Sequence, residues 1–268
     1  MKILAIDSSG LPACAAIVED GTLLAEFSIQ YKKTHSQTLL PMIDEISKII
    51  ELDKESLDAV AVAGGPGSFT GLRIGSATAK GIGLALGKKL VHVPTLEGMA
   101  CSFYGSGALI CPMMDARRSQ VFAGVYTFIR SDCTEEGAFG DVLQYSLKTV
   151  LDQVPVDVEE LCEKLNAYSA GTGKEVILMG DGAAAYRTLL SERLTVPYMF
   201  APVNLNAQKA SSVAVRALQM LREGKTESAA DHRPDYLRVS QAERVREEKR
   251  IAAKRSAAQK TAPEPSGD

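Results

Sequence analysis

The fold is decided by residues 1–29, which read MKILAIDSSGLPACAAIVEDGTLLAEFSI. Lys2 to Asp7 is a short apolar run that ends in an acid. Residues 14–19 and 22–29 are rich in apolar and β-branched side chains, and the Asp20-Gly21 pair between them is a strong hairpin signal. The segment therefore predicts three consecutive strands, the last two joined by a tight turn.

The residues that follow continue the pattern as alternating helices and strands. We expect helices over 36–51, 70–86 and 95–103, and strands over 58–63 and 90–93. Three initial strands followed by strand–helix units are typical of the ribonuclease H-like α/β fold, which begins with an antiparallel meander and continues with parallel strands.

The second half of the chain is a looser copy of the same order. We expect strands over 108–115, 120–129, 141–150, 175–179 and 198–201, and helices over 156–168, 182–194 and 206–222. The sequence thus predicts a duplicated fold with an N-terminal lobe over 1–104 and a less regular C-terminal lobe over 105–240.

A charged tail over 241–268 follows these lobes. It has seven basic and five acidic residues, a charge of +2, which leaves −5 for the rest of a chain whose net charge is −3. Val245 and Ile251 are its only large apolar residues. Because so little apolar surface cannot offset the entropy of ordering, we expect a frayed helix followed by disorder.

The overall composition excludes several classes of protein. The chain has 268 residues, of which 46% are hydrophobic and 24% charged, close to the averages of soluble globular proteins. No apolar run reaches the roughly 18 residues of a membrane span, and Asp7 comes too early for the apolar stretch of a signal peptide. A net charge of −3 argues against a broad nucleic-acid-binding face. We therefore expect a cytoplasmic protein with no membrane contact.

The spacing of cysteine and histidine predicts no metal site. None of the five cysteines forms a C-x-x-C pair, so free thiols in a reducing compartment are expected. His35, His92 and His232 are far apart in the sequence and form no H-x-x-x-H motif. No Ser/His/Asp or Cys/His set can be assembled from the sequence either, so we assign no catalytic residues.

A glycine-rich segment, GGPGSFTGLRIG at residues 64–75, joins the strand at 58–63 to the helix at 70–86. Such a turn can bind an anion at the start of the helix, but it lacks the lysine of a P-loop and the spacing of a dinucleotide loop. Phosphate binding and a tight turn required by the chain itself both stay open. The residues Asp7, Ser8 and Ser9 have the same two interpretations, as a vestigial nucleotide site or as a strand-ending turn.

Small residues recur every fourth position along the helix at 70–86, at Gly71, Gly75, Ala79, Gly83 and Gly87. Because glycine costs roughly 1 kcal/mol in a helix interior, the pattern indicates that another backbone approaches closely. The ridge could face the chain's own sheet or a subunit interface. We expect a partner surface made by the following residues: Leu39, Ile43, Ile46, Leu72, Gly75, Ala79 and Gly83.

Several segments together resemble the TsaB family, the bacterial tRNA threonylcarbamoyladenosine biosynthesis subunit. The resemblance rests on MKILAIDSS at the start, His35-Ser36, GGPGSFTGLRIG, MMDARRSQVFAGVY from residue 113, and PDYLR at 234–238. The glycine-rich segment is the most specific of these. The resemblance runs along about residues 1–240 and leaves out the tail.

The resemblance implies an actin-like, two-lobed ATPase architecture and a non-catalytic role. It implies a platform that binds TsaD, the subunit that transfers the threonylcarbamoyl group to the adenosine next to the anticodon. TsaE and tRNA would be reached through that complex, and homodimers would form through helices of the first lobe. No tightly bound cofactor is implied, although ATP or ADP with magnesium at the partner interface stays open. TsaD holds a metal through paired histidines, which this chain lacks.

Two other functions stay open. The chain could be an ATP-dependent kinase or hydrolase of the actin and sugar-kinase superfamily that uses Asp7 with bound magnesium, although no second phosphate loop or general base is identified. A peptidase has no nucleophile set to support it. Turnover of Mg-ATP by the isolated chain would distinguish the kinase from the scaffold.

Overall fold

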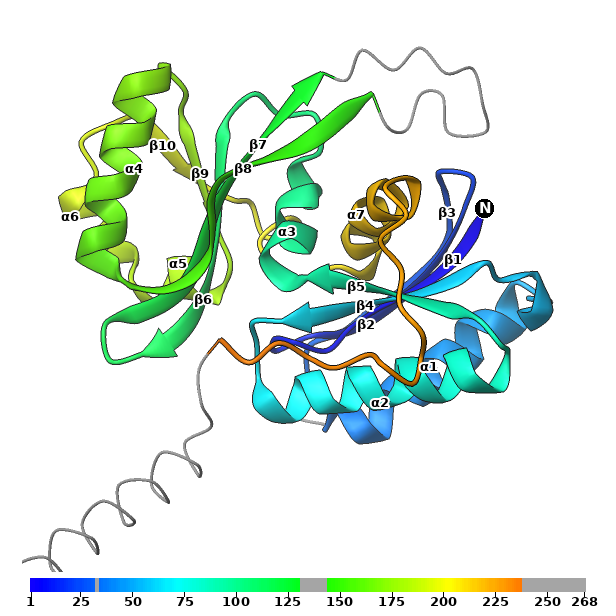
Figure 1. Cartoon of the computed structure of the whole chain (residues 1–268). Coiled ribbons are helices and arrows are strands. Elements are labelled where there is room, and N and C mark those ends of the chain that lie inside the picture. Colours follow the sequence, from blue (N-terminus) through cyan, green and yellow to red (C-terminus); the bar gives the residue numbers. More distant parts are fainter. Residues whose placement is uncertain (32–33, 131–143, 238–268) are drawn as a thin grey trace, which may run out of the picture.

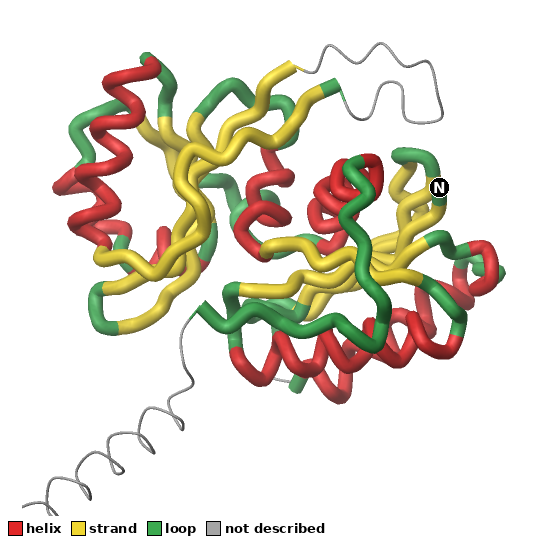
Figure 2. The backbone as a smooth tube through the Cα atoms, viewed as in Figure 1, coloured by secondary structure: helices red, strands yellow, loops and turns green. Residues whose placement is uncertain are grey.

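A computed structural model describes residues 1–31, 34–130 and 144–237, which form two five-stranded sheets with helices on both faces (Figures 1 and 2). The expected tail at 241–268 and the first residues of the strand expected at 141–150 lie outside the described residues. No helix within the described part of the chain is long and apolar enough to span a bilayer.

The first sheet has the strand order β3-β2-β1-β4-β5. Its strands are β1 (Lys2–Asp7), β2 (Ala13–Glu19), β3 (Thr22–Ile29), β4 (Ala59–Gly65) and β5 (Lys89–Pro94). β1 pairs antiparallel with β2 and parallel with β4, with Ala5 opposite both Ala16 and Ala61. The expected antiparallel start and parallel continuation are confirmed.

One face of this sheet is covered by α1 (His35–Ile49) and α2 (Phe69–Ala85). Apolar side chains of α1, such as Leu39 and Ile46, pack on Leu4 and Ile17 of the sheet. The short helix η1 (Lys54–Ser56) joins α1 to β4. Pro41 lies inside α1, where it removes one backbone hydrogen bond, but the helix continues through it to Ile49.

The second sheet has the strand order β10-β9-β6-β7-β8. Read from β8 to β10, this order matches that of the first sheet from β3 to β5. Its elements are β6 (Leu109–Arg117), β7 (Gln120–Arg130), β8 (Tyr145–Asp157), β9 (Val176–Met179), β10 (Tyr198–Phe200), α4 (Val158–Thr172), α5 (Asp181–Ala185) and α6 (Arg187–Arg193). β6 pairs antiparallel with β7 and parallel with β9, as β1 does with β2 and β4. The chain therefore has the expected duplicated α/β architecture.

Two details of the second half differ from expectation. The helix expected over 182–194 is broken into α5 and α6 at Tyr186, whose φ and ψ of −108° and 23° are not helical. The strand expected to end at residue 150 extends as β8 to Asp157, because it stays paired with β7 past two register shifts. A long hairpin results.

The helices that end the two halves are exchanged between the sheets. α3 (Thr95–Ala100), which follows the first sheet and continues into η2 (Cys101–Phe103), packs on β6, β7 and β9 through Leu96 and Met99. α7 (Ala210–Arg222), which follows the second sheet, packs on the first through Val213 and Ala217. Both helices lie between the sheets (Figure 1). The division at residue 104 stays a prediction, but α7 lies on the first sheet.

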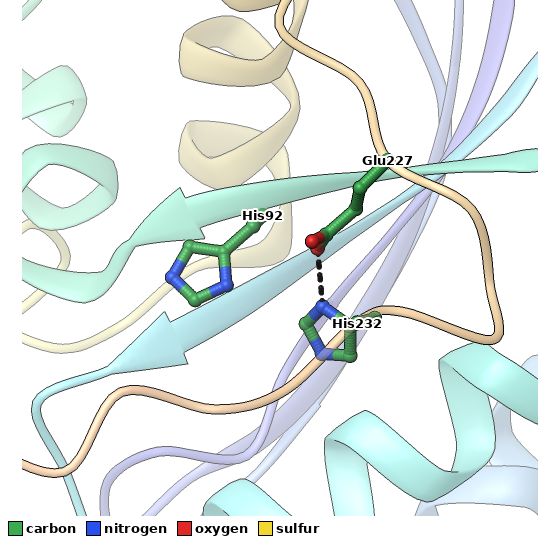
Figure 3. Close-up of side chains that lie close together, drawn as sticks. All are labelled: His92, Glu227 and His232. Atoms are coloured by element: carbon green, nitrogen blue, oxygen red, sulfur yellow. Dashed lines mark hydrogen bonds and ion pairs between the residues drawn. The ribbon is translucent and has the colours of Figure 1, made fainter.

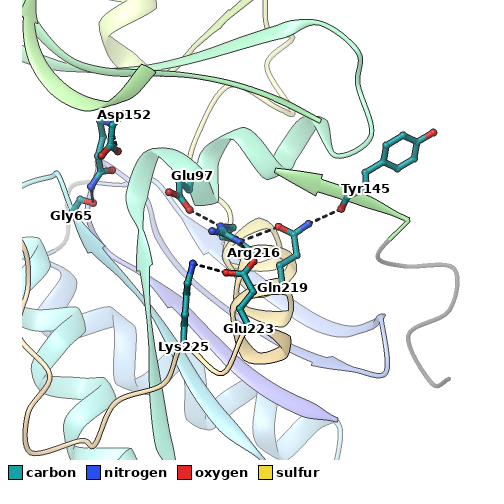
Figure 4. Close-up of polar contacts among 9 residues, drawn as sticks. Gly65, Glu97, Tyr145, Asp152, Arg216, Gln219, Glu223 and Lys225 are labelled. Atoms are coloured by element: carbon teal, nitrogen blue, oxygen red, sulfur yellow. Dashed lines mark hydrogen bonds and ion pairs between the residues drawn. The ribbon is translucent and has the colours of Figure 1, made fainter. Parts of the chain in front are cut away.

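A polar network joins the exchanged helices (Figure 4). Arg216 Nε of α7 lies 2.5 Å from Glu97 Oε2 of α3, and both side chains are largely buried. Arg216 Nη1 donates to Gln219 Oε1, and Gln219 Nε2 donates to the carbonyl oxygen of Tyr145 at 2.9 Å. Both lobes are thereby attached to α7.

Candidate functional site

A cleft of about 570 Å³ separates the lobes where β1 ends. The turn after β1, the start of α1 and the glycine-rich loop line one side, and the β6–β7 hairpin and the start of α5 line the other. Among the described residues that line it are Ser9, Gly10, His35, Gly67, Ser68, Thr70, Gly71, Asp115, Arg117 and Asp181. This is the position that the sequence assigned to a vestigial nucleotide site.

Asp7 lies beneath this cleft and does not line it. Its residue is 1% exposed, and Oδ1 accepts hydrogen bonds from the Ser9 amide at 2.8 Å and the Ser9 hydroxyl at 2.6 Å. Oδ2 is buried without a hydrogen-bond partner. Burial raises the pKa of the Asp7 carboxyl to about 6, although the two bonds from Ser9 and the charge of His35 oppose the rise. A carboxyl group so enclosed is poorly placed to hold a magnesium ion in the cleft.

The glycine-rich loop packs against the turn after β1. Ser8 Oγ donates to the carbonyl oxygen of Gly71 at 2.8 Å, and the Ser68 amide donates to the carbonyl oxygen of Ser9 at 2.7 Å. A Cβ atom at Gly71 would lie 2.0 Å from the Ser8 carbonyl oxygen, and one at Gly67 would lie 2.5 Å from that of Ser9. These contacts favour the tight-turn interpretation, since the glycines make room for the chain itself.

The loop also uses its own amides to begin the helix. The Gly71 amide donates to Ser68 Oγ, the N-cap of α2, at 3.3 Å. The Gly65 amide donates to Thr95 Oγ1. The amides of Gly65, Ser68 and Gly71 are therefore bonded within the chain.

Acidic groups lie on the other side of the cleft. The Asp115 amide donates to Asp181 Oδ1, and the Tyr186 hydroxyl donates to Asp115 Oδ1 at 3.1 Å. Burial raises the pKa of Asp181, while backbone donors lower it in part. His35 Nε2 lies 3.0 Å from the Gly10 carbonyl oxygen and holds the near wall together. None of the described lining residues is a lysine.

The residues expected to form a partner surface are buried, so this expectation is corrected. Leu39, Ile46 and Leu72 are each 1% exposed, Ala79 is fully enclosed, and Ile43 is also buried. The small residues of α2 face the sheet: a Cβ at Gly75 would lie 2.5 Å from Ser8 Oγ, and one at Gly83 would lie 2.5 Å from Leu90 Cδ1. Of the two interpretations of the ridge, packing inside the chain is the one observed. All seven residues are buried, and one of them, Ile43, also lines a groove between α1 and α2.

The outer edges of the same two helices border an apolar groove of about 540 Å³. Its apolar walls include Leu40, Pro41, Ile82, Ala85 and Leu86, with Asp44, Ser47 and Lys54 among its polar lining residues. Leu40 is 56% exposed, and Leu84 on the neighbouring turn of α2 is 63% exposed. The residues expected from the sequence lie on the inner side of these two helices, because the small-residue pattern drew attention to that side.

The fold also brings together residues that sequence spacing kept apart. His92, Glu227 and His232 lie side by side at the edge of the first sheet (Figure 3). The sequence contains no short motif that signals this cluster, because its parts come from β5 and from the segment after α7.

Comparison with known proteins identifies the family. The family model described as TsaD: tRNA N6-adenosine threonylcarbamoyltransferase matches residues 22–245. The Escherichia coli protein named tRNA threonylcarbamoyladenosine biosynthesis protein TsaB is 31% identical, over 89% of this chain and 95% of its own length. The chain belongs to the TsaB family. The TsaB protein of Bacillus subtilis is 27% identical over 91% of this chain and 96% of its own length.

A solved structure agrees in fold. The structure titled YeaZ from Pseudomonas aeruginosa superposes with a TM-score of 0.69 at 22% identity, and covers 88% of this chain and 99% of that chain. TsaB relatives are thus matched along nearly their whole length. The resemblance expected from the sequence is confirmed, and with it a role in tRNA threonylcarbamoyladenosine biosynthesis.

Proposed function

We propose that this chain is a non-catalytic scaffold subunit that binds and supports a TsaD-type threonylcarbamoyltransferase. The apolar groove between the outer edges of α1 and α2 carries the partner role, because Leu40 in its wall and Leu84 beside it are exposed in the part of the chain that the structure describes. A second copy of the chain would fit the same apolar surface, so a homodimer and the heterodimer would compete for it.

The closed turn after β1 supports the non-catalytic part of the proposal. Asp7 is buried and bonded to Ser9, and Ser8 is bonded to Gly71. A phosphate could use these side chains only if it replaced the hydrogen bonds that they make within the chain. Hydrolysis of ATP by the chain alone should therefore be weak or absent, and any ATP or ADP with magnesium would bind in the assembled complex. In this proposal, tRNA and TsaE are also reached only through the complex, in the cytoplasm.

Substitutions in the groove test the partner role. Leu40→Glu and Ala85→Glu place a charge on the apolar walls without entering the core, so the chain should stay folded. Binding to the organism's own TsaD, measured by titration of the purified proteins, should weaken at least tenfold, which is about 1.4 kcal/mol. Sedimentation of the isolated variants would report whether self-association weakens as well.

Val203→Glu is the matched control, because Val203 is an apolar residue 94% exposed on the other lobe. It should bind TsaD like the wild type. Unchanged binding by both groove variants would place the partner surface elsewhere. Threonylcarbamoyl transfer to unmodified tRNA, or sustained Mg-ATP turnover, by the isolated chain would reject the scaffold in favour of an enzyme.

A further inference from the structure

A cluster of metal-ligating side chains lies at the edge of the first sheet, away from the groove between α1 and α2. His92 belongs to β5, and Glu227 and His232 belong to the segment after α7 (Figure 3). One ligand atom from each of the three lies within 4.8 Å of the others. We propose that His92, Glu227 and His232 bind one divalent transition-metal ion of the zinc class.

His232 is the most enclosed of the three. Its side chain is 0% exposed, Nδ1 lies 2.6 Å from Glu227 Oε1, and Nε2 is buried with no hydrogen-bond partner. An imidazole nitrogen that has released its proton offers the lone pair that a metal requires.

His92 faces the same space from β5. Gly64 makes room for its ring, since a Cβ there would lie 2.1 Å from His92 Cε1. His92 Nε2 lies 3.1 Å from Asp235 Oδ2 but makes no hydrogen bond. Because the Asp235 amide donates to the Gly64 carbonyl oxygen at 2.7 Å, the Asp235 backbone is fixed beside the cluster, and its carboxylate can supply a fourth ligand or orient His92.

The donor set selects the class of metal. Two imidazoles with one or two carboxylates suit zinc, cobalt, nickel or copper, whereas magnesium and calcium prefer all-oxygen sites. A small cavity of about 200 Å³, lined in part by His92 and Glu227, adjoins the cluster and gives an ion a way in. Two lysines lie nearby: Lys80 Nζ donates to the carbonyl oxygens of Ala230 and His232, and Lys225 Nζ pairs with Glu223.

A metal here would fasten the C-terminal segment to the sheet. That segment touches β5 through two backbone bonds between Leu90 and Glu227, each 3.0 Å. Shared ligands would add a cross-link between β5 and residues that follow α7, and binding energy at such a site adds to folding stability. The role is structural and independent of the proposed partner surface.

Titration of the metal-free full-length protein with Co²⁺ and Zn²⁺ tests the site. We expect one equivalent of Co²⁺ to bind with visible d–d absorption and without a thiolate charge-transfer band, and Zn²⁺ to displace it and raise the melting temperature by several degrees. His92→Gln and Glu227→Gln should each weaken Co²⁺ binding at least tenfold. These two side chains are partly exposed, so their variants should fold even if a His232 variant does not.

His35→Gln is the matched control, because His35 is the remaining histidine and lies in the cleft between the lobes. It should bind Co²⁺ with wild-type affinity. The proposal is overturned if no saturable binding occurs at one equivalent, if His92→Gln and Glu227→Gln bind as the wild type does, or if a thiolate band shows that cysteines hold the ion.

Discussion

Asp7 is an ionisable side chain that the fold encloses almost completely. Its pKa is raised to about 6 because burial disfavours the carboxylate, so the folded chain binds a proton there more tightly than the unfolded chain, whose carboxyl has a pKa near 3.8. The contribution of Asp7 to the free energy of unfolding therefore falls as the pH rises from about 4 to about 6, and it stays low above pH 6. At neutral pH the fold holds a buried, half-satisfied carboxylate.

Asp7→Asn should stabilise the chain at pH 8, since the amide keeps the shape and an acceptor for Ser9 but has no charge. The gain should be at most about 3 kcal/mol, from a shift of about two pKa units at 1.36 kcal/mol each. Urea denaturation of both chains from pH 4 to 8 measures it. The difference should shrink toward zero near pH 4, and an Asn variant less stable than wild type at pH 8 would contradict the prediction.

At the scale of the elements, α2 shows what a sequence can and cannot reveal. Its small residues at every fourth position correctly indicated a close approach of another backbone, but the pattern is the same whether that backbone belongs to the chain or to a partner. The strands β1 to β3 were predictable because apolar and β-branched runs and a turn pair are local signals. The cleft was half predictable. The glycine-rich loop, Asp115 and Asp181 each lie near the end of an expected strand, but the sequence could not show that the two lobes bring them to opposite walls of one cleft.

Two substitutions in α2 measure that difference. Gly75→Leu should destabilise the chain by about 3 kcal/mol or more, because even its Cβ would lie 2.5 Å from Ser8 Oγ. Gly81→Ala on the exposed face has nothing within 4 Å and should stabilise the chain by up to about 1 kcal/mol. Thermal unfolding followed by circular dichroism reports both. A Gly75→Leu chain as stable as wild type would mean that the ridge does not face the sheet.

At the scale of the whole molecule, the exchange of α3 and α7 makes each sheet depend on a helix from the other half. Local patterns predicted both helices but could not say which sheet each covers, because an amphipathic stripe fits any apolar face. The buried pair Arg216 and Glu97 lies where the two exchanged helices meet. Histidines 92 and 232 meet for the same reason, since the chain returns to the first sheet after the second is complete.

Arg216→Met should destabilise the chain by about 3–5 kcal/mol, because it leaves the Glu97 carboxylate buried without its partner. Arg193→Met is the matched control: it breaks the exposed pair with Glu159 and should cost no more than about 1 kcal/mol. Chemical denaturation of the two variants gives the comparison. Equal, small losses would show that the pair between α3 and α7 is screened like a surface pair.

The exchanged position of α7 also has a consequence for the order in which the protein is made. A ribosome releases β1 to β5 first, but the helix that covers their second face, with Val213 and Ala217, is made only after the whole second sheet. Apolar side chains such as Ile3, Val91 and Val93 therefore stay exposed to solvent while the whole second sheet is synthesised. The nascent chain is therefore open to aggregation while the second sheet is synthesised, and we expect a chaperone to bind this uncovered face during that time.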